Sequence, residues 1–198
     1  MAPPSSDNFS RRSFLKGSGA AAAATAITQN VASAAEQTAA ADIVSGWSTI
    51  SLNVNGRDHE VQVEPRTTLL EVLRYQLNLT GAKPVSLDGS SGASTVLVDG
   101  KPIMASTCLA LSVRGKAIET VESMVDDAVP QAFVEHDAQQ CGFCTPGFVV
   151  AVRAFLNEHP QATQEEIQAG LNGNICRCGT YANVIQAAMS VVKGGANG

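Results

Sequence analysis

The sequence has little positive charge, only three histidines and no apolar run long enough to span a membrane. Its 13 Lys and Arg residues are outnumbered by 18 Asp and Glu residues, which gives a net charge of −5. The basic residues do not cluster, and the histidines form no metal-ligand pattern. A membrane span needs about 18 continuous apolar residues, and no stretch reaches that length. These absences argue against a nucleic-acid-binding protein and against a protein anchored by a transmembrane helix.

The first 34 residues have the features of an export signal. Ser10-Arg11-Arg12-Ser13-Phe14-Leu15-Lys16 is a twin-arginine sequence, and an alanine-rich run from residue 17 to about residue 31 precedes an Ala32-Ser33-Ala34 cleavage pattern. An amphipathic or transmembrane helix is the alternative, but the run is short and interrupted by polar residues. We therefore predict a twin-arginine signal peptide over residues 1–34 and a linker over residues 35–46. Such proteins cross the membrane folded, which predicts a periplasmic location. The remaining chain has 10 basic and 17 acidic residues, a net charge of −7.

Four of the five cysteines form two closely spaced pairs. They are Cys141-Gly-Phe-Cys144 and Cys176-Arg-Cys178. Four thiolates make a complete cage for an iron–sulfur cluster, and zinc is an acceptable second occupant. Two disulfides are the other alternative in an oxidising compartment, but Cys176 and Cys178 are too close to pair easily with each other.

The first half of the chain after the signal is predicted to be rich in β-structure, with one helix. Asn55-Gly56 is a hairpin signal between two alternating segments, and Thr68-x-x-Glu71 is a capping box at the start of a helix that ends near Thr80-Gly81. A turn over residues 99–102 separates two further extended segments. The four predicted extended segments are residues 49–54, 59–63, 94–98 and 103–111.

The second half changes to helical periodicity. Helices are predicted over residues 146–159, 163–171 and 181–193. One cysteine pair directly precedes the first of these helices, and the other pair lies between the last two. The helix ends should therefore bring the two pairs together. Backbone N–H groups at helix starts favour negative charge, which suits a thiolate-ligated cluster.

The segments around these cysteines resemble a known family. Gln140-Cys141-Gly-Phe-Cys144-Thr-Pro-Gly-Phe and Gly173-Asn-Ile-Cys176-Arg-Cys178-Gly-Thr-Tyr are similar to motifs in the iron–sulfur subunit of molybdenum hydroxylases, the xanthine dehydrogenase and aldehyde oxidoreductase family. The resemblance implies an α+β fold, with a ferredoxin-like β-grasp domain at residues 47–122 and a four-helix-bundle [2Fe-2S] domain at residues 123–198. It also implies site residues. Cys141, Cys144, Cys176 and Cys178 would bind the cluster, and Gln140 and Cys178 would contact the pterin of a partner subunit.

The chain departs from this family at a second cluster site. Ser86, Ser91 and Ser94 stand where the family has cysteine, and only Cys108 matches a ligand position. An alcohol is far less acidic than a thiol and is a poorer ligand for iron, so three serines should not hold a cluster. We therefore predict one [2Fe-2S] cluster per chain and a degenerate second site. The loop should instead be held by hydrogen bonds from its Ser and Asp side chains.

The resemblance implies electron transfer within a periplasmic molybdopterin-dependent oxidoreductase that hydroxylates an aldehyde or an N-heterocycle. This chain would carry no catalytic residue, because the molybdopterin cofactor lies on a large partner subunit. Without the second cluster, electrons would pass directly to a FAD subunit or a cytochrome. A structural, redox-inactive clamp subunit of the same assembly is the alternative.

Overall fold

A computed structural model describes residues 44–195 of the chain. The predicted signal peptide, and the predicted linker up to residue 43, lie outside the described residues. None of the helices within residues 44–195 has the length and apolar character of a membrane span.

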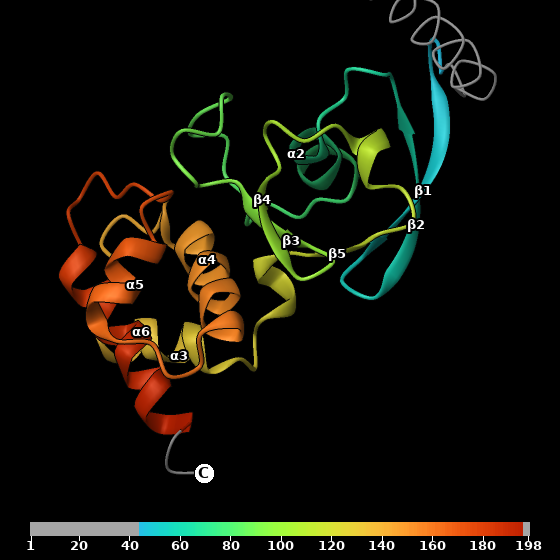
Figure 1. The fold of residues 1–198 in the computed structure, drawn as a ribbon. Coiled ribbons are helices and arrows are strands. Elements are labelled where there is room, and N and C mark those ends of the chain that lie inside the picture. The colour runs from blue at the N-terminus through green and yellow to red at the C-terminus, as the bar shows by residue number, and fades with distance from the viewer. Residues whose placement is uncertain (1–43, 196–198) are drawn as a thin grey trace, which may run out of the picture. The chain divides into compact units, whose positions relative to one another are not determined.

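Five strands form one mixed sheet (Figure 1). Their order is β2-β1-β5-β3-β4, with β1 and β5 parallel and the other neighbours antiparallel. The strands are β1 (Ser48–Val54), β2 (Arg57–Val63), β3 (Thr95–Val98), β4 (Lys101–Met104) and β5 (Ala117–Glu119). The predicted hairpin between β1 and β2 is present. Asn55 and Gly56 both have positive φ, 52° and 75°, as a tight two-residue turn requires.

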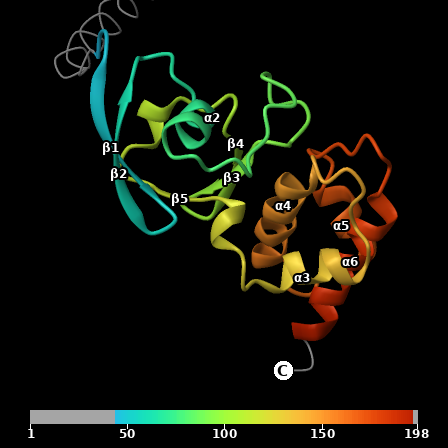
Figure 2. The same cartoon turned by 180° about the vertical axis from the view of Figure 1, so that it is seen from behind.

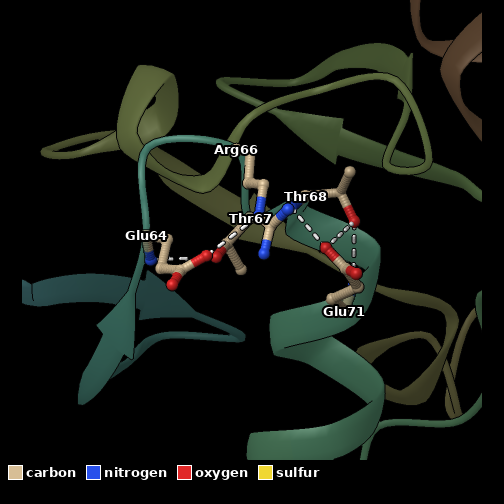
Figure 3. Close-up of polar contacts among 5 residues, drawn as sticks. All are labelled: Glu64, Arg66, Thr67, Thr68 and Glu71. Carbon is tan, nitrogen blue, oxygen red and sulfur yellow. Dashed lines mark hydrogen bonds and ion pairs between the residues drawn. The ribbon is translucent and has the colours of Figure 1, made fainter. Parts of the chain in front are cut away.

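The predicted helix begins where its capping box places it. The Glu71 N–H donates to Thr68 Oγ1 at 3.2 Å, and the Thr68 N–H donates to Glu71 Oε2 at 2.7 Å (Figure 3). Within this predicted helix, only the first three residues, α2 (Leu69–Glu71), are α-helical. The chain then widens into a π-helical segment over Val72–Gln76. The helical segment therefore ends earlier than the predicted boundary near residue 80.

The predicted extended segment over residues 103–111 is correct only for residues 103 and 104. β4 ends at Met104, and a 3₁₀ turn occupies Ala110–Val113. The reason lies in the backbone partners of this stretch. The Cys108 carbonyl accepts a hydrogen bond from the Leu69 N–H at 2.7 Å, so the chain packs against the start of α2 instead of continuing as a strand.

Four helices follow the sheet, and they pack together in both ribbon views (Figures 1 and 2). They are α3 (Ala128–Glu135), α4 (Thr145–Glu158), α5 (Gln164–Gly170) and α6 (Tyr181–Gly195). The predictions for α4, α5 and α6 are confirmed to within two residues, and Thr163 caps α5 as expected. The periodicity analysis missed α3. Asp127 caps this helix by accepting from the Val129 N–H at 2.8 Å, and Pro130 is tolerated in its first turn.

Two hydrophobic clusters hold the described residues together. One lies between the sheet and α2, with Leu52, Leu69 and Ile118 fully buried. The other joins the four helices around Phe133 and Phe148 and also includes Leu97 of β3. Helix α4 packs against β3, so the two clusters meet along one strand. The α+β prediction is confirmed.

Candidate functional site

The first cysteine pair lies at the beginning of α4. Gly142 has a φ of 77°, which turns the chain sharply between the two cysteines. Cys144 directly precedes the first helical residue, and its carbonyl accepts from the Phe148 N–H at 3.1 Å. Pro146 lies in the first turn, where a missing N–H costs nothing. The predicted placement of this pair before the helix is confirmed.

The second pair lies in the loop between α5 and α6, also as predicted. Cys176 is only 6% exposed, and its N–H donates to the Tyr181 hydroxyl at 2.8 Å. The Thr180 hydroxyl lies 3.2 Å from Cys176 Sγ, and Thr180 is itself 7% exposed. A thiolate has no proton, so Thr180 must donate in this contact once Cys176 is ionised. Cys178, two residues further along, is exposed.

Cys144 and Cys176, one from each pair, pack in the same hydrophobic cluster and affect each other's ionisation. The pKa of the Cys144 thiol is raised to about 12, first by burial, then by its hydrogen bond with Cys176 and by the charges of Cys176 and Cys141. Burial also disfavours the Cys176 thiolate. Hydrogen bonds from Thr180 and from the Cys144 thiol outweigh burial and lower the pKa of Cys176 to about 7. The Cys176 thiol thus ionises readily, and the Cys144 thiol resists ionisation, first because it is partly buried and then because of its interactions with Cys176 and Cys141.

The donor set fits a [2Fe-2S] core. All five cysteines have free thiols, so no disulfide competes for them. The mutual repulsion of the thiolates is what a cationic core relieves, because metal coordination deprotonates thiols outright. In the described part of the chain, Thr145 Oγ1 is buried beside Cys144 and has no hydrogen-bond partner. Its hydroxyl proton is therefore not used by another group of the described chain.

Single-ion sites have a different geometry. Among residues 44–195, no three His, Cys, Asp or Glu side chains are grouped closely enough to hold one metal ion. A [2Fe-2S] core divides its four thiolates between two irons, so it does not require three ligands around one point.

The four positions of the degenerate site form three separate hydrogen-bonding groups. The Ser86 and Ser91 hydroxyls are 2.8 Å apart, while the buried Ser94 hydroxyl donates to Ser106 Oγ at 3.0 Å. Cys108 Sγ lies 3.5 Å from the Ser112 hydroxyl and packs against the sheet cluster. The side chains at the four predicted ligand positions thus bond to neighbouring hydroxyl groups in three different places.

Hydroxyl and carboxylate groups also hold the exposed tip of this loop. Asp88 Oδ1 accepts from the Ser90 hydroxyl at 2.7 Å and from the Ser90 N–H at 3.0 Å. These two bonds are the main causes of the lowered pKa of the Asp88 carboxyl group. The loop therefore has the side-chain hydrogen bonds that the serine-rich sequence predicts.

Two family models match the chain. The [2Fe-2S] binding domain model matches residues 117–189, and the twin-arginine translocation signal model matches residues 8–28. The second match confirms the predicted export signal.

Curated relatives and solved structures extend these matches to most of the chain. The aldehyde oxidoreductase iron–sulfur-binding subunit of Escherichia coli strain K12 is 37% identical over 91% of this chain and 86% of its own length. The nicotinate dehydrogenase small FeS subunit of Eubacterium barkeri is 37% identical over 75% of this chain and 98% of its own length.

The chain belongs to the family of iron–sulfur subunits of molybdenum hydroxylases.

A solved structure of this family supports the assignment in three dimensions. A chain of quinoline 2-oxidoreductase from Pseudomonas putida 86 superposes with a TM-score of 0.73 at 36% identity, covering 78% of this chain and 99% of that one. The matched regions include the sheet as well as the helices, because the helical half alone is too short to give this coverage.

Sequence reasoning missed the residues that surround the cysteines. Thr180 and Asn174 have no ligand signature, and only the structure shows their contacts with Cys176 and with the Gly92 carbonyl. The buried, unpaired Thr145 hydroxyl likewise has no sequence signal. The position of Thr180 four residues after Cys176, just before a helix, is the one sequence signal that could have indicated it. Gln140, which the sequence singled out, is exposed.

Proposed function

We propose that the chain is the electron-transfer subunit of an exported, molybdopterin-dependent oxidoreductase, and that it works in the periplasm. The observation that carries this proposal is the proximity of Cys144, at the start of α4, to Cys176, in the loop before α6. The two side chains pack in the same hydrophobic cluster, and each shifts the pKa of the other. The twin-arginine signal supports export of a folded, cofactor-loaded protein. The family assignment supports the redox role, and nothing in the comparisons favours the redox-inactive clamp.

Four of the five cysteines have a role in this proposal. Cys141, Cys144, Cys176 and Cys178 hold one [2Fe-2S] cluster, which supplies one-electron transfer when bound. The start of α4 offers backbone N–H groups to a negatively charged group beside Cys144. The Thr180 hydroxyl donates to Cys176 Sγ and stabilises negative charge on that sulfur. The protein thus fixes the position of the thiolates and tunes their charge.

The domain division of the sequence analysis remains part of the proposal. Residues 47–122 form the ferredoxin-like β-grasp domain, and residues 123–198 form the four-helix [2Fe-2S] domain. The division is supported by the two hydrophobic clusters, one around the sheet and one around α3 to α6. Residues 1–34 are the signal and residues 35–46 the linker.

The partner is proposed to be a large molybdopterin-binding subunit. Cys141 and Cys178 are exposed, and Phe143 and Ile175 next to the two pairs are 51% and 54% exposed. Exposed apolar side chains beside the thiolates suit a surface that another subunit covers. Gln140 and Cys178 on this surface would contact the pterin. The substrate would be an aldehyde or an N-heterocycle, the classes named in the relatives.

Electrons would leave the chain directly from the helical half. The contacts of Ser86, Ser91, Ser94 and Cys108 leave no set of thiolates for a second cluster. The proposed electron acceptor is a FAD subunit or a cytochrome that approaches the single cluster of the helical half.

Metal analysis and EPR of the purified complex test the proposal. We expect two irons and two acid-labile sulfides per copy of this chain, one EPR signal on reduction and substrate-dependent dye reduction. Four irons with two resolved signals would contradict the single-cluster assignment. Absence of iron together with an intact complex would favour the structural clamp.

A further inference from the structure

The serine-rich loop around Ser91 is hydrogen-bonded to the loop that carries Cys176 and Cys178. The Ile175 N–H donates to the Ser91 carbonyl at 3.0 Å, and Ile175 directly precedes Cys176. The Asn174 side chain donates to the Gly92 carbonyl at 3.1 Å, in a buried bond between residues 82 positions apart. The backbone of the serine loop thus anchors the segment that presents Cys176.

Close packing strengthens this connection. Gly92 has a φ of 66°, and a Cβ atom there would lie 2.7 Å from Asn174 Nδ2 and would also collide with the Gly173 carbonyl. On the other side, a Cβ atom at Gly147 would collide with the Gly92 carbonyl. Gly147 lies in the first turn of α4, three residues after Cys144. Residue 92 therefore lies between the two elements that position the two cysteine pairs.

Serine hydroxyl groups keep this part of the loop in shape. Ser86 Oγ accepts from the Ser91 N–H at 3.0 Å and contacts Ser91 Oγ at 2.8 Å. The Gly92 carbonyl accepts from Thr95 Oγ1 at 2.6 Å in addition to its bond with Asn174. A continuous series of bonds thus runs from Ser86 through Ser91 to the residue before Cys176.

We propose that residues 86–95, here called the brace, hold the cluster site of the helical half in its working geometry, with Ser86 and Asn174 as positioning residues. This inference rests on the proposed function, since it concerns the [2Fe-2S] cluster assigned to Cys141, Cys144, Cys176 and Cys178. The brace does so without binding metal. Hydroxyl-to-backbone hydrogen bonds, such as those of Ser86 and Thr95, hold it in shape.

Two matched pairs of variants test the brace in the full complex. Asn174→Ala removes the buried amide donor, and Asn172→Ala removes an exposed amide two residues earlier as its control. Ser86→Ala removes the acceptor for the Ser91 N–H, and Ser51→Ala, which removes an exposed hydroxyl on β1 outside the brace, is its control. The Gly92 carbonyl keeps its Thr95 partner in Asn174→Ala, so that variant leaves no backbone group unpaired.

The readouts are the EPR g values and linewidth of the reduced cluster and the rate of iron release to a chelator. Loss of one such hydrogen bond should speed iron release by about three- to tenfold. We expect Asn174→Ala and Ser86→Ala to change the EPR signal and to release iron faster, while both controls match wild type. A merely structural role would lower the melting temperature and leave the EPR signal unchanged.

The outcomes separate this inference from the proposed function. If wild type carries the cluster and neither Asn174→Ala nor Ser86→Ala changes the EPR signal or iron release, the brace is refuted while the proposed function stands. If wild type carries no [2Fe-2S] signal, the proposed function fails and the brace fails with it. If one of the two variants does not fold, the other variant and its control decide.

Discussion

Thr180→Val tests whether a buried hydroxyl sets the reduction potential of the proposed cluster. Thr180 is 7% exposed, and its hydroxyl lies 3.2 Å from Cys176 Sγ. Valine has nearly the same shape and the same β-branching, so it fills the site without a cavity. It has no proton to donate, and the Cys176 sulfur therefore loses this hydrogen bond.

The expected shift follows from the strength of the bond. A hydrogen bond to a charged group contributes about 1.5–3 kcal/mol. The bond is present in both oxidation states, but it is stronger in the reduced state, because reduction adds one negative charge. We take this extra stabilisation of the reduced state to be about 1 kcal/mol. For a one-electron couple about 1.4 kcal/mol corresponds to about 59 mV, so Thr180→Val should make the midpoint potential more negative by about 40 mV.

An EPR-monitored redox titration of the complex measures this shift. Thr180→Ser is the matched control, because it keeps the hydroxyl and should keep the potential near that of wild type. A Thr180→Val complex with full iron content and the wild-type potential would refute the reasoning. A lower melting temperature at an unchanged potential would show that the hydroxyl only supports the fold.

Three further predictions concern the other cysteines, the export signal and the helix start. Cys141→Ser should lose cluster iron and visible absorbance. Cys108→Ser should keep its iron and lower the stability by at most about 1–3 kcal/mol, the cost of burying a hydroxyl. Iron loss in Cys108→Ser would instead reveal a mixed-ligand metal site. Arg11→Lys combined with Arg12→Lys should leave cofactor-loaded protein in the cytoplasm on cell fractionation, and unchanged periplasmic delivery would contradict the signal assignment. Gly147→Ala should lower the melting temperature, because its Cβ would collide with a carbonyl of the brace; an unchanged melting temperature would show that this contact relaxes easily.

Local signals explain why much of the fold could be predicted. Asn55-Gly56 supplies the positive φ values of its hairpin, and Thr68 and Thr163 form capping boxes with the Glu three residues later. Each of these features depends on residues within one turn of each other. The periodicity of α4 and α6 is equally local, because buried residues recur along one helix face.

Elements that depend on distant partners could not be predicted in the same way. β5 (Ala117–Glu119) has three residues, and it exists because it pairs with β1 on one side and β3 on the other. α3 (Ala128–Glu135) carries Pro130 near its start, which weakens the sequence signal for a helix. The π-helical widening at Val72–Gln76 likewise leaves no mark in the hydrophobic pattern.

The candidate site divides along the same line. The thiolate ligands were visible because cysteine is rare and its spacing is distinctive. The groups that act on those thiolates were not visible. Nothing in the sequence marks Thr180 as a partner of Cys176, and the contact is seen only in the folded turn before α6. Asn174 donates to the carbonyl of Gly92, which lies 82 residues earlier in the chain.

The structure also shows what holds the loop in which serine occupies three of the four predicted ligand positions. The segment before Cys176 contacts the loop through backbone atoms, the carbonyls of Ser91 and Gly92, and these two bonds do not depend on the side chain at a predicted ligand position. Serine is smaller than cysteine, and its hydroxyl can take over the internal bonds, as Ser86 does for the Ser91 N–H. Gly92 has no such freedom, because any side chain there would enter the Asn174 loop. The positioning role proposed for the loop therefore needs no metal, and Gly92 is a position where the neighbouring atoms leave no room for a side chain.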